Sequence, residues 1–300
     1  MDRVASIRRL LPGFRDLLSS LAETSTRRRF TLVKSFASRD QESAVTSAKR
    51  RTVCILDSSF NPPTKAHMYL AIQALQKYTP KSPNEEDPAE DPPSLLLLLA
   101  TSNADKAPAP AAYEHRIAMM SLLADEIRDV YAQETSTTDV PRIDIGITRH
   151  ARFIDKSEDL YTNYLYPRAQ TRQIWIMGYD TLIRLLDTKY YPPEHTLTPV
   201  YDTLLSGRNR ILVFGRPGDE FGSDELQREY SENVDSRVSE RLDMVLADDD
   251  KTAGISSTKV RKGIMDTISN AYDVYDWRGA VCASIAEYVI DEPVYHQPRR

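Results

Sequence analysis

The sequence contains few cysteines, no long apolar run and no excess of basic residues. Its two cysteines, Cys54 and Cys282, cannot build a disulfide framework or a zinc site of their own, and they indicate a reducing compartment. No run approaches the ~20 apolar residues that a membrane-spanning helix needs. The formal net charge of −5 argues against a general binder of nucleic-acid backbones, which would be strongly basic. We therefore expect neither a membrane span nor a nucleic-acid partner.

The chain is long enough to bury a large core. Its 300 residues, of which 41% are apolar and 28% charged, are typical of a globular protein with one large domain or two small ones. We divide it into a basic N-terminal extension over residues 1–50, an α/β domain over 51–292 and a tail over 293–300.

The N-terminal extension is strongly basic. Residues 1–50 hold nine Arg and two Lys against three Asp and two Glu. That composition resembles a transit peptide, but Asp2, Asp16 and Glu23 interrupt the pattern. Six apolar residues fit one face of a helix, namely Leu10, Leu11, Phe14, Leu17, Leu18 and Leu21. We expect a docked helix and a cytoplasmic or nuclear protein; a mitochondrial presequence is the alternative.

Short apolar runs alternate with helical patterns from Thr52 onward. The runs predict strands over 53–56, 95–99, 143–147, 174–177, 211–214 and 242–246. Helices are expected over 65–78, 113–131, 179–189, 224–241, 257–268 and 277–290. Most of the strands are apolar throughout, which indicates burial on both faces of a parallel sheet. The fold predicted is α/β, with a Rossmann-like doubly wound parallel sheet that binds ligands beyond the carboxyl ends of its strands.

The segment 79–94 interrupts the first strand–helix–strand unit. It holds five Pro and five acidic residues among sixteen, a composition that buries too little apolar surface to offset the entropy of ordering. We interpret it as a solvated, mobile insertion.

The strongest chemical signal follows the first strand, in residues 57–67 (DSSFNPPTKAH). Small polar residues at a strand end, followed by helix starters, aim backbone N–H groups and a helix N-terminus at one point. This pattern predicts an anion site. His67 lies three residues after Thr64, so both side chains project from the first helical turn. The alternative is that Thr64 only caps the helix and His67 is an ordinary surface histidine.

A second anion-binding pattern lies at residues 254–261 (GISSTKVR). Three hydroxyls, from Ser256, Ser257 and Thr258, precede a helix, and Arg261 stands one turn inside it. Hydroxyl caps and a guanidinium together suit a phosphate group. Taken alone, the three hydroxyls indicate only a helix cap.

Five ordered motifs carry a resemblance to a known family. They are SSFNPPTKAH (58–67), NADKAPAPAAYEHRIAMM (103–120), IMGYDTLIRLLDTKYY (176–191), LVFGRPG (212–218) and ISSTKVR (255–261). In them the chain resembles the nicotinamide mononucleotide adenylyltransferases of the nucleotidylyltransferase superfamily, most closely their fungal branch, over roughly residues 50–290. That resemblance implies transfer of an adenylyl group from ATP, with Mg²⁺, to nicotinamide mononucleotide, which yields NAD and pyrophosphate.

The resemblance also implies roles for particular residues. Backbone groups of Ser58, Ser59 and Phe60 would hold nucleotide phosphates, beside Thr64, and His67 would contact the α-phosphate as the catalytic residue. Gly178 and Asp180 would receive the adenosine ribose. The triphosphate would be held by Ser256, Ser257, Thr258 and Arg261. Lys106 is the candidate for the mononucleotide phosphate and Arg216 for the nucleotide side of the cleft. No residue is assigned to a metal of the protein's own.

Some interpretations stay open at this point. Asp180 could instead cap a helix that starts at Thr181, and Arg216 could be a turn residue that pairs with Asp219. Ser58 stands where the characterised branches have glycine. Trp175 and Trp277 fit core packing better than a nicotinamide site. The other functions compatible with the motifs are nucleotidyl transfer to another substrate, ATP hydrolysis, and nucleotide binding without catalysis. The choice between nicotinamide and nicotinic acid forms, and the oligomeric state, are also open.

Overall fold

The computed structural model describes residues 2–23, 29–37, 50–80, 91–102, 111–191, 196–216, 221–246, 252, 254–271, 274–292 and 294–295. Most of the predicted insertion, residues 81–90, lies outside these ranges, and so does Lys106.

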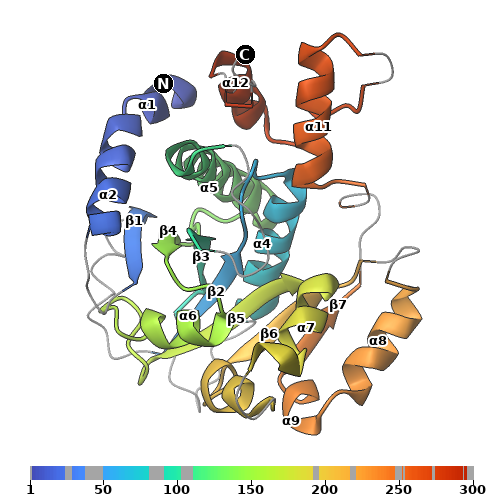
Figure 1. Cartoon of the computed structure of the whole chain (residues 1–300). Coiled ribbons are helices and arrows are strands. Elements are labelled where there is room, and N and C mark those ends of the chain that lie inside the picture. The colour runs from blue at the N-terminus through green and yellow to red at the C-terminus, as the bar shows by residue number, and fades with distance from the viewer. Residues whose placement is uncertain are drawn as a thin grey trace.

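A seven-stranded sheet forms the centre of the molecule, in the order β1-β4-β3-β2-β5-β6-β7 (Figure 1). The strands are β1 (Phe30–Phe36), β2 (Arg51–Asp57), β3 (Ser94–Ala100), β4 (Ile143–Thr148), β5 (Thr171–Gly178), β6 (Arg210–Phe214) and β7 (Leu242–Val245). Every neighbouring pair is parallel except β1 and β4. The predicted doubly wound α/β fold is confirmed, with all six predicted strands in place.

Helices cover both faces of this sheet, as Figure 1 shows. One face packs against α1 (Arg3–Arg8), α2 (Leu11–Glu23), α4 (Lys65–Tyr78), α5 (Tyr113–Thr135), α11 (Ser257–Ile268) and α12 (Ala283–Asp291). The other packs against α6 (Phe153–Leu160), α7 (Tyr179–Leu185), a π-helical turn (Val200–Leu204) and α9 (Ser236–Ser239), with α8 (Asp224–Asn233) beside β7.

The central strand β3 shows why continuous apolar runs predict this arrangement. Leu95, Leu97 and Leu99 are fully buried in the core under α4 and α5. Leu96 and Leu98 are equally buried, in the core on the opposite face. Successive side chains of a strand point to opposite faces, so a strand covered on both sides must be apolar at every position.

Four predicted helices differ from those observed. The helix expected over 113–131 continues to Thr135. The helix expected over 179–189 ends at Leu185, and Asp187 instead caps a short 3₁₀ turn (Thr188–Tyr190). The helix expected over 224–241 is divided into α8 and α9, because Asp235 accepts a hydrogen bond from the Arg237 amide and starts a new helix. The helix expected from residue 277 begins only at Ala283, since 277–280 form a turn.

The N-terminal extension docks on the domain, as expected from its apolar face. Leu11 and Phe14 are buried in the same core as α5. The expectation was wrong for Leu10, which is 41% exposed, because α1 ends at Arg8 and a new helix starts at Leu11. Val4 and Ile7 of α1 are buried in its place.

The extension also supplies β1, which the sequence pattern did not predict. This strand pairs with β4 at the edge of the sheet. A Cβ atom at Gly146 of β4 would lie 2.4 Å from the Phe30 ring, so only glycine there lets the ring pack on the sheet. The division at residue 50 stays a prediction, although residues on both sides of it build one sheet. No helix within the described ranges is long and apolar enough to cross a membrane.

Candidate functional site

A large cavity lies beyond the carboxyl ends of β2 and β5. The chain leaves β2 toward β3 on one side and leaves β5 toward β6 on the other, so the loops after these neighbouring strands diverge. This is the switch point at which doubly wound sheets bind ligands. The cavity has a volume of about 1060 Å³, and it is lined by the segments that follow β2 through β6 and by the start of α11.

Eleven of the residues singled out in the sequence line this cavity. They are Ser58, Ser59, Thr64, His67, Gly178, Asp180, Arg216, Ser256, Ser257, Thr258 and Arg261. The Phe60 side chain is not at the cavity wall, because it is fully buried and its ring packs on the His67 ring with centroids 5.3 Å apart. Lys106 lies outside the described residues.

The cavity wall is cationic although the chain as a whole is acidic. Among the residues that the structure describes, its lining holds two carboxylates, Asp57 and Asp180. Against these stand seven Lys and Arg residues, namely Arg116, Arg152, Lys156, Arg184, Arg216, Lys259 and Arg261. A cleft lined by one sign of charge concentrates a ligand of the opposite sign. The electrostatics therefore suit a polyanion such as a nucleoside triphosphate.

The loop after β2 offers free backbone donors to such an anion. Phe60 adopts a positive φ of 44°, which turns the chain sharply at the strand end. Within the part of the chain that the structure describes, the Ser59 and Phe60 amides donate no hydrogen bond. The Ser58 amide, in contrast, donates to the Leu98 carbonyl at 3.2 Å. The Ser59 and Phe60 amides are thus open to the expected backbone contact with phosphate, whereas the Ser58 amide already has a protein acceptor; the contact expected of Ser58 stays a prediction.

His67 is held by protein groups at both ring nitrogens. Its Nδ1 lies 3.1 Å from the Thr64 amide nitrogen and 2.8 Å from Thr64 Oγ1, so the histidine completes the cap of α4. Its Nε2 lies 2.9 Å from Ser58 Oγ. Burial lowers the pKa of His67 to about 4. His67 is therefore neutral at pH 7 and is more than an ordinary surface residue.

Asn61 joins three distant segments to the loop between β2 and α4, residues 58–64, which is called the phosphate loop below. Its Oδ1 accepts hydrogen bonds from the Ala111 amide before α5 (3.0 Å) and from the Tyr295 hydroxyl (2.9 Å). Its carbonyl oxygen accepts one from Arg261 Nη1 at 2.6 Å. Asn61 and Tyr295 are buried, so both groups need these partners.

The start of α11 adjoins this loop. Ser256 caps the helix by accepting a hydrogen bond from the Lys259 amide at 3.2 Å, and Ser257 Oγ donates to the Pro62 carbonyl at 2.8 Å. Arg261 also donates to Thr258 Oγ1 at 3.1 Å. The structure thus brings the two anion-binding patterns, about 200 residues apart in sequence, to one end of the cavity.

Asp180, which follows β5, lies in the cavity wall between two arginines. Its carboxylate lies 3.2 Å from Arg184 Nη2 and 3.7 Å from Arg216 Nη1. α7 begins at Tyr179 with Gly178 as its N-cap, so the alternative of Asp180 as a cap for Thr181 is wrong. A Cβ atom at Gly178 would lie 2.8 Å from Asp180 Oδ1, so glycine leaves room for the carboxylate. Arg216 pairs with Asp180; Asp219 lies outside the described residues.

The motif analysis did not identify one ionic pair in the cavity wall. Lys156 of α6 donates to the carboxylate of Asp57, at the end of β2, and both side chains are buried. The Phe153 ring lies 4.9 Å from the Lys156 ammonium. The sequence offered one signal for this pair, which is the position of Lys156 along the chain. Its helix, 153–160, follows the carboxyl end of β4, the edge of the sheet at which ligands bind.

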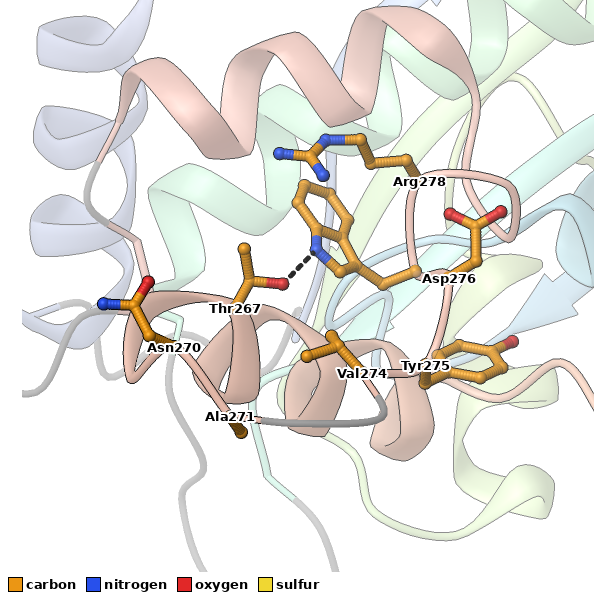
Figure 2. Close-up of a pocket in the computed structure, with 8 residues that line it drawn as sticks. Thr267, Asn270, Ala271, Val274, Tyr275, Asp276 and Arg278 are labelled. Carbon is orange, nitrogen blue, oxygen red and sulfur yellow. Dashed lines mark hydrogen bonds between the residues drawn. The ribbon is translucent and has the colours of Figure 1, made fainter.

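A second hollow, of about 570 Å³, lies at the other end of α11 (Figure 2). Figure 2 shows Thr267 accepting a hydrogen bond across it, which Trp277 Nε1 donates at 3.2 Å. Trp277 is buried against Gly263 of α11, and Trp175 is buried in the opposite core beside Phe153. Both tryptophans therefore serve packing, as the sequence analysis expected.

Comparisons with known proteins agree with this geometry. Residues 55–263 match the model of the cytidylyltransferase-like family. A Schizosaccharomyces pombe protein named "Putative nicotinamide mononucleotide adenylyltransferase" is 34% identical over 223 residues, which cover 72% of this chain and 76% of that protein. The structure of Plasmodium falciparum nicotinic acid mononucleotide adenylyltransferase complexed with NaAD superposes with a TM-score of 0.50 at 15% identity, over 82% of this chain and 98% of that one. The last likeness concerns the fold alone. The chain belongs to the cytidylyltransferase-like family, and within it to the nicotinamide mononucleotide adenylyltransferases.

Proposed function

We propose that this protein transfers the adenylyl group of ATP to nicotinamide mononucleotide, forming NAD and pyrophosphate. The observation that carries the proposal is the convergence of the loop 58–67, the start of α11 and Asp180 on one cationic cavity. The choice of nicotinamide mononucleotide as acceptor is supported by the name of the S. pombe relative.

The nucleotide would lie along the cavity from Asp180 to α11. The ribose hydroxyls would donate to the Asp180 carboxylate, which Arg184 and Arg216 hold in place. The triphosphate would meet the free Ser59 and Phe60 amides, the N-terminus of α11 and Arg261. Lys106 remains the proposed contact of the mononucleotide phosphate.

The proposed reaction requires the protein to position the two substrates and to stabilise the negative charge that develops. An oxygen of the mononucleotide phosphate attacks the α-phosphorus, the bond from that phosphorus to the β-phosphate oxygen breaks, and pyrophosphate leaves with the electron pair. The attacking oxygen is already anionic, so no general base is needed. In-line positioning and donors aimed at the developing charge supply the rate. Mg²⁺ would arrive as part of the substrate, bound to the ATP phosphates.

The test is to incubate the purified chain with ATP, Mg²⁺ and a panel of mononucleotides, and to separate the products by chromatography. We expect NAD and equimolar pyrophosphate with nicotinamide mononucleotide. A product formed only from nicotinic acid mononucleotide would change the acceptor but keep the reaction type. Release of ADP or AMP without a dinucleotide would favour ATP hydrolysis, and the absence of any product would favour nucleotide binding without catalysis. The Asp180→Ala variant serves as the matched control for contaminating activity.

A further inference from the structure

The Ser58 hydroxyl lies between His67 and the cavity. Its Oγ is 2.9 Å from His67 Nε2, and the residue is half-buried at the cavity wall. The Ser58 amide is already used by the Leu98 carbonyl, so the hydroxyl is the group through which Ser58 can meet a ligand.

The hydrogen bonds around the His67 ring fix the place of its proton. The Thr64 amide can only donate, and it donates to Nδ1 at 3.1 Å, so Nδ1 carries a lone pair. The ring is neutral at pH 7, because burial lowers its pKa to about 4. The single ring proton of a neutral imidazole with an unprotonated Nδ1 is on Nε2. His67 Nε2–H therefore donates to Ser58 Oγ.

This protonation state excludes a nucleophilic role for Ser58 and favours a role as a hydrogen-bond donor. A nucleophilic serine needs a histidine lone pair to accept its proton, and here the nitrogen that faces Ser58 carries a proton. An oxygen that accepts a hydrogen bond has its own proton left to donate. Ser58 Oγ donates to no group of the described residues. The bond from His67 polarises the hydroxyl, and polarisation along a chain of hydrogen bonds strengthens the next donor.

We propose that the Ser58 hydroxyl is the catalytic donor to an oxygen of the transferred α-phosphate, and that His67 is a positioning residue that aims this hydroxyl. No proton is transferred: the hydroxyl shares its hydrogen with the phosphate oxygen as negative charge moves during the displacement. The inference rests on the proposed function, and it differs from the role implied by the family resemblance, in which His67 touches the phosphate itself. It applies to any phosphate ester that this cavity binds.

A double-mutant cycle, measured on dinucleotide formation, tests whether His67 acts through Ser58. Ser58→Ala should lower kcat about 100-fold, as loss of one preorganised donor does elsewhere. Ser58→Thr, which keeps a hydroxyl, should retain activity within about 10-fold of the unaltered protein. His67→Ala should lower kcat about 10-fold and weaken ATP binding less than Ser58→Ala does, because the donor remains but is less well aimed.

The decisive comparison is the double variant Ser58→Ala/His67→Ala. If His67 acts only through Ser58, the double variant should be as active as Ser58→Ala alone. The inference is overturned if His67→Ala costs the same factor with alanine at position 58 as with serine, or if Ser58→Ala retains normal turnover. Circular dichroism and thermal melting of each variant separate a loss of fold from a loss of the donor.

Two measurements need no dinucleotide formation and so distinguish failure of the inference from failure of the proposed function. In ¹⁵N-histidine NMR spectra of the free protein at pH 7, His67 should show a protonated Nε2 and an unprotonated Nδ1. The reverse tautomer would overturn the inference even if the protein made NAD. If no acceptor yields a dinucleotide, ATP binding by calorimetry decides instead: Ser58→Ala should bind ATP at least 3-fold more weakly, and equal affinity would overturn the inference.

Discussion

The hydroxyl of Tyr295 donates a hydrogen bond of 2.9 Å to Oδ1 of Asn61, which links the C-terminal part of the chain to the phosphate loop. The same oxygen accepts the Ala111 amide, so one buried side chain aligns that loop with the start of α5. Burial raises the pKa of the Tyr295 hydroxyl, which is therefore protonated and able to donate throughout the neutral range.

Removing that hydroxyl should lower both the free energy of unfolding and the catalytic efficiency with ATP. We expect Tyr295→Phe to lower the free energy of unfolding by about 1 kcal/mol and kcat/KM for ATP several-fold, because Asn61 loses one of its two side-chain partners. Tyr288→Phe is the matched control, since Tyr288 is also buried but pairs with His115, away from the loop. It should lose comparable stability at unchanged kcat/KM. Equal kinetic losses in the two variants would show that Asn61 is not specifically aligned by Tyr295.

Asp180 should matter for binding ATP. Asp180→Ala removes the acceptor for the ribose hydroxyls, so the affinity should fall by about 1–3 kcal/mol by isothermal calorimetry. Asp180→Asn, which keeps one acceptor oxygen, should bind with intermediate affinity. Glu158→Ala provides the control, because it breaks a comparable arginine pair, with Arg168, at the surface. An unchanged affinity together with a lower melting temperature would reduce Asp180 to a structural partner of Arg184 and Arg216.

The N-terminal helices should contribute to stability through particular side chains. Phe14 is 7% exposed, so Phe14→Ala should lower the free energy of unfolding by about 3–5 kcal/mol in urea titrations. Leu10→Ala changes a neighbouring apolar residue that is 41% exposed, and its effect should stay within about 0.5 kcal/mol. Similar small losses for both variants would mean that the extension is not docked in solution.

The neutral His67 predicts a dependence of stability on pH. Its pKa is about 4 in the folded chain and about 6.5 when unfolded, so between these values the unfolded state binds more protons. The contribution of His67 to the free energy of unfolding is therefore fully present above pH 6.5. It is lost as the pH decreases toward 4, by up to about 3 kcal/mol. The difference in unfolding free energy between the unaltered protein and His67→Gln should shrink over that window. A difference that is constant from pH 7.5 to pH 4.5 would contradict the assigned protonation state.

The strands and the positions of most site residues could be predicted because their signals are local. A run such as residues 95–99 is apolar at every position only when both faces are covered, and the hydroxyls at 256–258 precede a helix in the sequence itself. Contacts between distant segments left no such signal. The Asp180–Arg216 pair joins the loops after β5 and β6, and the Asp57–Lys156 pair joins β2 to a helix too polar to stand out. β1 was missed because its residues lie in a basic segment and only its two end residues are buried.

The pairing of β1 with β4 gives the N-terminal segment a protective role at the edge of the sheet. β4 is buried at every position, and without β1 its outer N–H and C=O groups would be a template for a strand of another molecule. Phe30 packs against Gly146 at this junction, and this contact favours the chain's own strand at that edge. A chain that lost its first 36 residues would thus keep every group named in the cavity yet become prone to self-association.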